Sequence, residues 1–142
     1  MEDEQTARIV RGVLSLGRRL RAERPQGSVS LSAIGLLSTL HRLGTMPAVK
    51  LAAEQQLQPQ SLTRLLTALE RDGLISRTPG DVDRREILIA LTARGLDVLA
   101  ADMRVRRQWL ERAMAATLTD DERAVLLTAS DAMLKLAGYG GQ

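Results

Sequence analysis

The sequence predicts a mainly α fold with one small β-hairpin. Over most of the 142 residues, apolar side chains recur at intervals of three and four, which is the spacing of one face of a helix. After Gly73 the spacing changes to alternation, which is typical of strands. Short tracts rich in Pro, Gly or polar residues separate these segments. We therefore expect a single domain over residues 1–142, with helices on both sides of a hairpin.

Two helices are predicted in the first third of the chain. Residues 5–24 have helical apolar spacing and end before Pro25. Ser30 or Ser32 can cap the second helix, and Gly44 closes it. The apolar residues of these two helices are Ile9, Val13, Leu16, Leu20, Leu36, Leu37, Leu40 and Leu43.

Two more helices are predicted in quick succession. Pro47 suits the first turn of a short helix, with Thr45 as a possible cap. Pro59 suits the first turn of the next helix, which ends at Asp72-Gly73. The core-facing stripe of this second helix consists of Leu62, Leu65, Leu66 and Leu69.

The turn between these helices departs from a common pattern. Many helix-turn-helix turns contain Gly where this chain has Gln56, and Ser or Thr where it has Gln58. A non-glycine residue in the left-handed region costs about 1–2 kcal/mol, so we expect a looser turn. Because Gln58 is a poor cap, we expect Gln60, Ser61 or a bound DNA to satisfy the start of the helix.

The outer face of the second helix has the side chains that hydrogen-bond base edges and phosphates. They gather in its N-terminal half, where the helix dipole also favours a phosphate. The predicted DNA contacts on this helix are Gln58, Gln60, Ser61, Thr63, Arg64 and Arg71. The alternative interpretation is a polar face in contact with solvent only.

A short hairpin follows. Residues 74–78 form its first strand, Pro79-Gly80 ends that strand, and residues 86–91 return. A helix fits the DNA major groove, and a basic hairpin tip can enter the neighbouring minor groove. This combination is a winged helix, and it indicates DNA binding. The predicted contacts in the hairpin are Arg77, Asp83, Arg84 and Arg85.

The hairpin also carries a family resemblance. The string D-V-D-R-R-E-I-L-I-A-L-T-A-R-G, residues 81–95, resembles the wing and following helix start of MarR-type transcriptional regulators. The preceding R-L-L-T-A-L-E-R-D-G-L-I-S-R is similar to the recognition helix and first wing strand of that family. The resemblance covers nearly the whole chain. It implies a winged helix at about 30–91 between dimerisation helices at about 5–24 and 92–137.

The same resemblance implies a function. A MarR-like protein is a homodimer that binds double-stranded DNA at a pseudo-palindromic operator, and many members release DNA when a small ligand or oxidant binds. We therefore expect a repressor with a small-molecule inducer. By position in the D-V-D-R-R string, Arg85 is expected in the minor groove, Arg84 nearer the phosphates, and Asp83 orienting an arginine. The alternative is a winged-helix protein-interaction module whose wing arginines are only solvated.

The last helices favour association between two chains. Thr92 caps a long helix, and Thr119 with Glu122 forms a capping box for the last one. Their stripes, with that of residues 5–24, can be buried between two chains as an intertwined bundle. The alternative is that they pack within one chain. The stripes of these two helices are Leu96, Leu99, Met103, Leu110, Met114, Val125, Leu126, Ala129, Met133 and Leu136.

The resemblance also implies a ligand pocket where the dimer helices meet the winged part. A cation near apolar walls suits an anionic aromatic or lipophilic acid. The candidate lining residues are Arg11, Arg18, His41, Met103, Arg107 and Trp109. The alternative is that these arginines are solvated and that no inducer exists.

The composition excludes several classes of protein. There is no cysteine, so disulfides, thiolate metal sites and thiol redox sensing are excluded. His41 is the single histidine, so neither a His-based metal cage nor a catalytic triad can form within a chain. We expect no enzymatic activity, metal or cofactor. No stretch approaches the roughly 20 apolar residues of a membrane span, and the acidic start does not resemble a signal peptide, so we expect a bacterial cytoplasmic protein.

Overall fold

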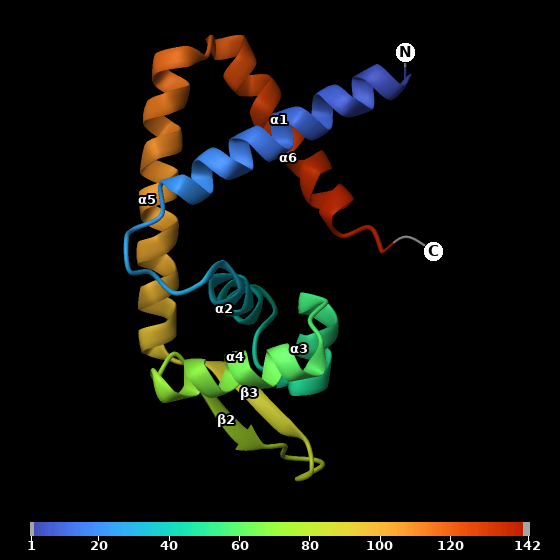
Figure 1. Cartoon of the computed structure of the whole chain (residues 1–142), viewed down its shortest axis with the longest axis vertical. Coiled ribbons are helices and arrows are strands. Elements are labelled where there is room, and N and C mark those ends of the chain that lie inside the picture. Colours follow the sequence, from blue (N-terminus) through green and yellow to red (C-terminus); the bar gives the residue numbers. More distant parts are fainter. Residues whose placement is uncertain (1, 141–142) are drawn as a thin grey trace. The chain divides into compact units, whose positions relative to one another are not determined.

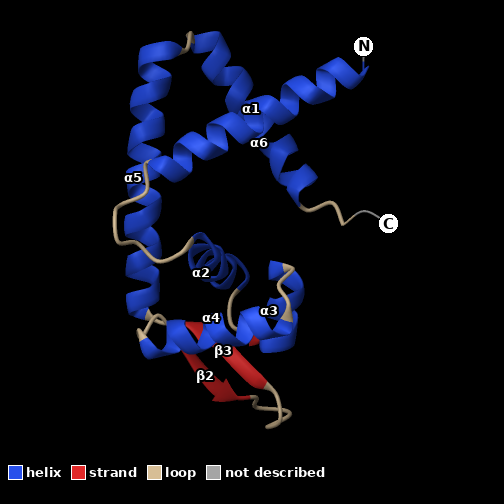
Figure 2. Ribbon diagram, viewed as in Figure 1, coloured by secondary structure: helices blue, strands red, loops and turns tan. Residues whose placement is uncertain are grey.

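The structure, a computed structural model that describes residues 2–140, confirms the mainly helical class (Figures 1 and 2). Within that range there are six helices and a three-stranded antiparallel sheet. The helices are α1 (Glu2–Ala22), α2 (Leu31–Leu43), α3 (Ala48–Gln55), α4 (Pro59–Arg71), α5 (Ala93–Thr117) and α6 (Asp120–Ala137). The strands are β1 (Met46–Pro47), β2 (Ile75–Pro79) and β3 (Ile87–Leu91).

The chain divides into two compact units. We call residues 24–105 the winged unit and residues 1–23 with 106–142 the helical unit. The winged unit contains the whole buried core, which is aliphatic because the chain has no Phe and its aromatic content is 1%. The core residues come from α2, α3, α4, α5 and the sheet: Ala33, Ile34, Leu36, Leu37, Leu40, Met46, Leu51, Leu62, Leu66, Leu69, Leu74, Ile75, Ile89 and Leu99.

Helix α2 begins and ends where its capping residues predict. The Oγ of Ser30 accepts a hydrogen bond from the backbone N–H of Ala33 over 3.1 Å, so Ser30 rather than Ser32 is the cap. Gly44 follows the helix at φ 87°. One residue of the predicted stripe is not in the core: Leu43 is 48% exposed.

The turn into α3 differs from the prediction. Pro47 is the N-cap residue rather than part of the first helical turn, and Thr45 does not cap α3. The reason is that Met46 and Pro47 extend as β1 and pair with Ile89 and Leu88 of β3. A two-residue strand is too short to show alternation, so the sequence pattern contained no sign of it.

The turn after α3 is not loose, contrary to the prediction. Gln56 adopts the left-handed conformation, at φ 52° and ψ 38°, and its N–H is directed to the carbonyls of Ala52 and Ala53. This is a helix C-cap of the kind usually made by glycine. The turn therefore keeps its tight geometry, and the chain carries the conformational cost at Gln56.

Helix α4 is the second helix of the helix-turn-helix. Pro59 lies in its first turn, as predicted, and Gln58 is the N-cap residue without a side-chain capping bond. The predicted leucine stripe faces the core, with Leu65 only partly buried. The helix ends at Arg71 with Asp72 as its C-cap residue, and Gly73 follows at φ 76°.

The sheet has the order β1-β3-β2. Strands β2 and β3 form the predicted hairpin, with Ile75 opposite Leu91 and Arg77 opposite Ile89. After β3, the Oγ1 of Thr92 donates to the carbonyl of Gly73 over 2.6 Å and accepts from the N–H of Gly95 over 3.0 Å. Thr92 thus caps α5 and attaches its start to the end of α4.

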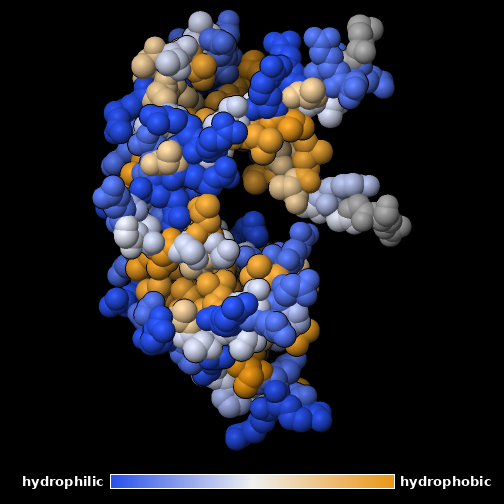
Figure 3. Space-filling model, viewed as in Figure 1, coloured by the Kyte–Doolittle hydropathy of each residue, from blue (hydrophilic) through white to orange (hydrophobic). Residues whose placement is uncertain are grey.

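The helical unit has little of its own core. No described residue of α1 or α6 is buried, and Figure 3 shows apolar side chains gathered over these two helices. The capping box of α6 is present, because Thr119 and Glu122 exchange side-chain and backbone hydrogen bonds. Among residues 2–140, no helix combines the length and the apolar character that a membrane crossing requires.

Candidate nucleic-acid interface

The outer face of α4 presents a row of hydrogen-bonding side chains. Gln58, Gln60, Thr63, Arg64 and Arg71 are exposed, and Ser61 is half-buried. A shallow, open hollow of about 510 Å³ lies over the first turns and is lined by Pro59, Gln60, Thr63 and Arg64. Thr63 donates its hydroxyl proton to the carbonyl of Pro59 over 2.9 Å, so its oxygen is left mainly as an acceptor. Such a face can hydrogen-bond base edges and phosphates.

The first turn of α4 has no side-chain cap. The carbonyl of Gln58 accepts the first helical hydrogen bond, from Leu62 over 3.0 Å, but its side chain bonds no backbone N–H of the helix. Contrary to the expectation, neither Gln60 nor Ser61 makes such a bond. Amide groups in this first turn are therefore left for water or a ligand, and the helix dipole favours a negative one.

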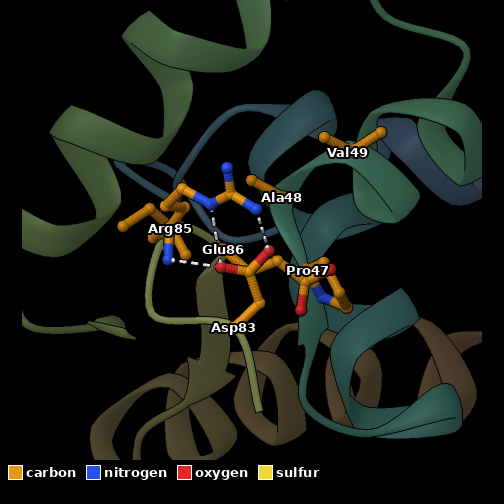
Figure 4. Close-up of a pocket in the computed structure, with 7 residues that line it drawn as sticks. Pro47, Ala48, Val49, Asp83, Arg85 and Glu86 are labelled. Atoms are coloured by element: carbon orange, nitrogen blue, oxygen red, sulfur yellow. Dashed lines mark hydrogen bonds and ion pairs between the residues drawn. The ribbon is translucent and has the colours of Figure 1, made fainter. Parts of the chain in front are cut away.

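The wing holds its second arginine in a fixed position. Asp83 accepts three hydrogen bonds from Arg85: from the backbone N–H over 3.0 Å, from Nε over 3.2 Å and from Nη2 over 3.3 Å (Figure 4). These bonds hold the pKa of the Asp83 carboxyl below its ordinary value of 3.8, and the side-chain bonds have the larger effect. The structure thus brings Asp83 and Arg85 together, and the role of Asp83 in orienting this arginine toward DNA stays a prediction.

An open cavity of about 450 Å³ separates the wing from the start of α3. Figure 4 shows the Arg85 guanidinium extending toward Ala48, and the Asp83 carboxylate lying near Pro47. The side chain of Arg85 remains 93% exposed despite its bonds. Arg84 is exposed as well. Both wing arginines are therefore accessible to a large polyanion.

The two remaining predicted arginines are already partnered. The Nη2 of Arg77 donates to the Oε1 of Glu70 over 3.2 Å, which ties β2 to α4. Arg77 is only 29% exposed, so it is held at the base of the wing. The Nε of Arg71 lies 3.5 Å from the Oδ1 of Asp72. Both side chains are exposed, so this ion pair is weak.

The comparisons with known proteins agree with this geometry. The MarR family model matches residues 29–87, which contain α2, α3, α4 and β2 and end at the first residue of β3. An uncharacterized HTH-type transcriptional regulator of Mycobacterium leprae is 38% identical over 125 residues, which cover 87% of this chain and 86% of that protein. The chain belongs to the MarR family of winged-helix transcriptional regulators. It is a DNA-binding protein and not an enzyme.

Solved structures of the same fold support this assignment. A transcriptional regulator protein of Pseudomonas aeruginosa PA01, described as putative, shares 35% sequence identity and a TM-score of 0.80, with 96% of this chain and 97% of that chain covered. A mutant MarR from E. coli, in complex with operator DNA, shares the fold with a TM-score of 0.67. Its identity is 23%, and the match covers 94% of this chain and 93% of that chain.

The residues predicted for a ligand pocket are divided between the two units of this MarR-family chain. Arg11, Arg18, Arg107 and Trp109 belong to the helical unit, whereas His41 and Met103 belong to the winged unit. His41 is exposed in the last turn of α2. Whether the six residues converge on one pocket stays a prediction.

Trp109 has a cationic neighbour that the sequence did not indicate. The guanidinium carbon of Arg19 lies 5.2 Å from the centre of the Trp109 ring, and Arg19 also pairs with Glu23 over 2.9 Å. Helical periodicity along α1 could not have revealed which arginine lies over the ring. Among the described residues, no three His, Cys, Asp or Glu side chains gather as a metal ion would need.

A buried polar contact also fixes α3 against α2. The Nε2 of Gln55 donates to the Oγ1 of Thr39, which in turn donates to the carbonyl of Gly35 over 3.0 Å. Thr39 is 5% exposed. The sequence pattern showed Gln55 only as part of a polar run that interrupts the helix. Its role is to position the first helix of the helix-turn-helix.

Proposed function

We propose that the chain acts as a homodimeric, sequence-specific repressor that a small ligand releases from its operator. The observation that supports this most strongly is the presence, in one compact unit, of an uncapped polar recognition helix and a wing with two exposed arginines. Bound over a promoter, such a dimer excludes the transcription machinery from the same DNA.

In this proposal, α4 reads bases in the major groove. Gln60 and Arg64 lie opposite the buried leucine stripe, Ser61 is half-buried at the side of that stripe, and all three contact base edges. Gln58, Thr63 and Arg71 flank these three residues, and they bind phosphates or hydrogen-bond further base edges. The open hollow over the first turns leaves room for a base edge to approach the helix.

The wing contributes a second contact in the adjacent minor groove. Arg85, oriented by Asp83, enters the groove, and Arg84 binds a phosphate. Arg77 supports the wing through its ion pair with Glu70. It also contacts a phosphate while it keeps this ion pair. Because Asp83 is already neutralised by Arg85, its carboxylate repels the DNA backbone less than a bare acid would.

The exposed apolar surface of the helical unit supports dimerisation. Its side chains would be unfavourably hydrated in a monomer, and a second copy can bury them as a helical bundle. A two-fold dimer presents two copies of α4, which matches a pseudo-palindromic operator. The exposed apolar residues of α1 and α6 are Ile9, Val10, Val13, Leu14, Val125, Leu127, Met133, Leu134 and Leu136.

The central experiment measures binding to a duplex that the wild-type protein selects from a random pool. Arg64→Ala should weaken binding to that duplex by about 1–3 kcal/mol, and binding to random DNA far less. Arg123→Ala, an exposed arginine on α6, is the matched control and should leave both affinities nearly unchanged. Equal loss on both duplexes would show that Arg64 only clamps phosphate. Failure to select any duplex would contradict sequence-specific binding.

Release by a ligand requires a pocket and a coupling. An anionic aromatic acid suits the arginines and apolar groups predicted for it, and Trp109 provides a fluorescence signal there. A ligand shifts DNA binding only if it prefers the form of the dimer that does not bind DNA. Saturable quenching by a phenolic acid, together with weaker binding to the selected duplex, supports the switch. Quenching without any change in DNA affinity would contradict it.

A further inference from the structure

The wing loop exposes an aliphatic side chain that no part of the chain covers. Val82 lies between β2 and β3 and is 103% exposed, the highest value among the exposed large hydrophobic residues of the described chain. Polar residues and glycine are the usual choices in such a loop, because a β-branched residue gains nothing from water and fits turns poorly. Val82 lies outside the helices and strands, and its two neighbours in the sequence, Asp81 and Asp83, are acidic.

Hydrogen bonds within the loop constrain its backbone. The N–H of Gly80 donates to the carbonyl of Glu86 over 2.8 Å, and the N–H of Glu86 donates to the carbonyl of Asp83 over 3.1 Å. The chain folds back so tightly that a Cβ on Gly80 would lie 2.5 Å from the Asp83 carbonyl oxygen. With the bonds between Asp83 and Arg85, these contacts fix the backbone on both sides of Val82, so little ordering is left to occur on binding.

Charge alone does not explain how this loop would hold DNA. Residues 81–86 contain three acidic and two basic side chains. One of the arginines, Arg85, is already paired with Asp83, which partly neutralises its charge. The loop therefore has little net Coulomb attraction for the phosphate backbone, and a contact that does not depend on charge is needed to hold the tip in the groove.

We propose that Val82 positions the wing by packing its isopropyl group against the deoxyribose walls of the minor groove, beside Arg85. This inference rests on the proposed function and identifies the apolar part of the wing contact. The minor groove is about 6 Å wide, and its sugar walls are rich in C–H groups, so a branched aliphatic side chain can pack against them.

The test compares two substitutions that keep the branch at Cβ. Val82→Thr replaces a methyl group by a hydroxyl of the same shape, and Val82→Ile keeps the apolar character. Binding to a duplex selected by the wild-type protein is measured from low to high salt. Val82→Thr should weaken binding about fourfold per wing, or about 15-fold for a dimer with both wings engaged. Val82→Ile should retain most of the affinity.

The salt dependence distinguishes an apolar contact from an ionic one. Removing an apolar group releases no counterions, so the line of log affinity against log salt should shift in parallel for Val82→Thr. Arg84→Ala should reduce the slope of the same line by about 1. Thermal unfolding of Val82→Thr should match the wild type, because the side chain is fully exposed.

Three results on the variants would overturn the inference alone. The first two are an unchanged affinity of Val82→Thr at every salt concentration and a loss accompanied by a change in slope. An equal loss for Val82→Ile would also overturn it, because an apolar contact tolerates that change. If the wild-type protein selects no duplex, the proposed function fails, and this inference fails with it.

Discussion

Arg24 and Asp102 form a buried ion pair that joins the segment after α1 to the middle of α5. The Nε of Arg24 donates to the Oδ1 of Asp102 over 2.9 Å, and the two side chains are 11% and 3% exposed. The Nη2 of the same guanidinium donates to the carbonyl of Val29. The pair therefore fixes the linker that leads into α2, within the winged unit.

The first prediction concerns the stability that depends on this pair. Asp102→Ala leaves the buried Arg24 cation without its carboxylate, and should reduce the free energy of unfolding by about 3–5 kcal/mol. Glu23→Ala is the control, because it breaks the more exposed pair with Arg19 and should cost only about 0.5 kcal/mol. Urea unfolding at one protein concentration measures both. Equal losses of unfolding free energy in the two variants would mean that burial does not make the Arg24–Asp102 pair more important for stability than the exposed pair.

The second prediction concerns the close contact between α5 and Leu74, in the turn between α4 and β2. A Cβ on Gly95 would lie 2.1 Å from the carbonyl oxygen of Leu74 and 2.8 Å from a methyl carbon of Leu91. Both are part of the packed winged unit, so the backbone itself must shift. Gly95→Ala should destabilise the protein by about 1–3 kcal/mol or more. This steric requirement explains the glycine at the end of the L-T-A-R-G string.

Gly35→Ala is the matched control for that substitution. Gly35 also lies in a helix of the winged unit, but its Cβ would meet only the Gln55 side-chain oxygen at an ordinary 3.5 Å. An alanine there should stabilise the helix by up to about 1 kcal/mol. Thermal unfolding of the two variants should therefore shift in opposite directions. A melting temperature for Gly95→Ala at or above that of the wild type would contradict the contact.

Local signals along the chain were sufficient to predict most of the helices in both units. Ser30, Thr92 and the capping box at Thr119 mark helix starts through short-range hydrogen bonds, and the leucine stripe of α4 marks its buried face. These features depend on residues within four positions of each other, so sequence spacing reveals them.

Contacts between distant residues could not be predicted in the same way. Arg24 and Asp102 are 78 positions apart, and no local pattern pairs them. One signal was present: Asp102 follows the buried Leu99 by three positions on α5, which places a carboxylate on the core-facing side of that helix. Strand β1 was missed because its two residues become a strand only by pairing with β3.

The third prediction uses the left-handed residue in the turn of the helix-turn-helix. Gln56→Gly removes a side chain that disfavours φ 52°, at the cost of a more flexible unfolded chain. The net result should be a gain of about 0.5–1 kcal/mol in the free energy of unfolding. Gln108→Gly is the control, because Gln108 is exposed inside α5 and the same change there should cost about 1 kcal/mol. Urea unfolding should show opposite signs, and a loss for Gln56→Gly would show that the turn is not strained.

The last prediction concerns the titration of Asp83 in the wing. Its pKa is held below 3.8 by the side-chain hydrogen bonds from Arg85 and, to a smaller extent, by the backbone hydrogen bond. Because the pKa is lowered in the folded loop, the stabilisation from this contact is complete above pH 3.8 and is lost as the pH falls through the lowered pKa. The Asp83–Arg85 contact should therefore stay intact throughout the neutral range in which DNA binding is measured.

Substitutions of the two wing arginines separate the causes of that lowered pKa. Arg85→Ala removes the guanidinium but keeps the backbone N–H, so the Asp83 pKa should rise part of the way toward 3.8. Arg84→Ala should leave it lowered, because Arg84 makes no bond to Asp83. Carboxyl carbon chemical shifts followed by NMR against pH give the pKa directly. A carboxyl that titrates alike in the wild type and in Arg85→Ala would show that the Arg85 side chain does not hold Asp83 in solution, and the wing would then meet DNA with an unrestrained arginine.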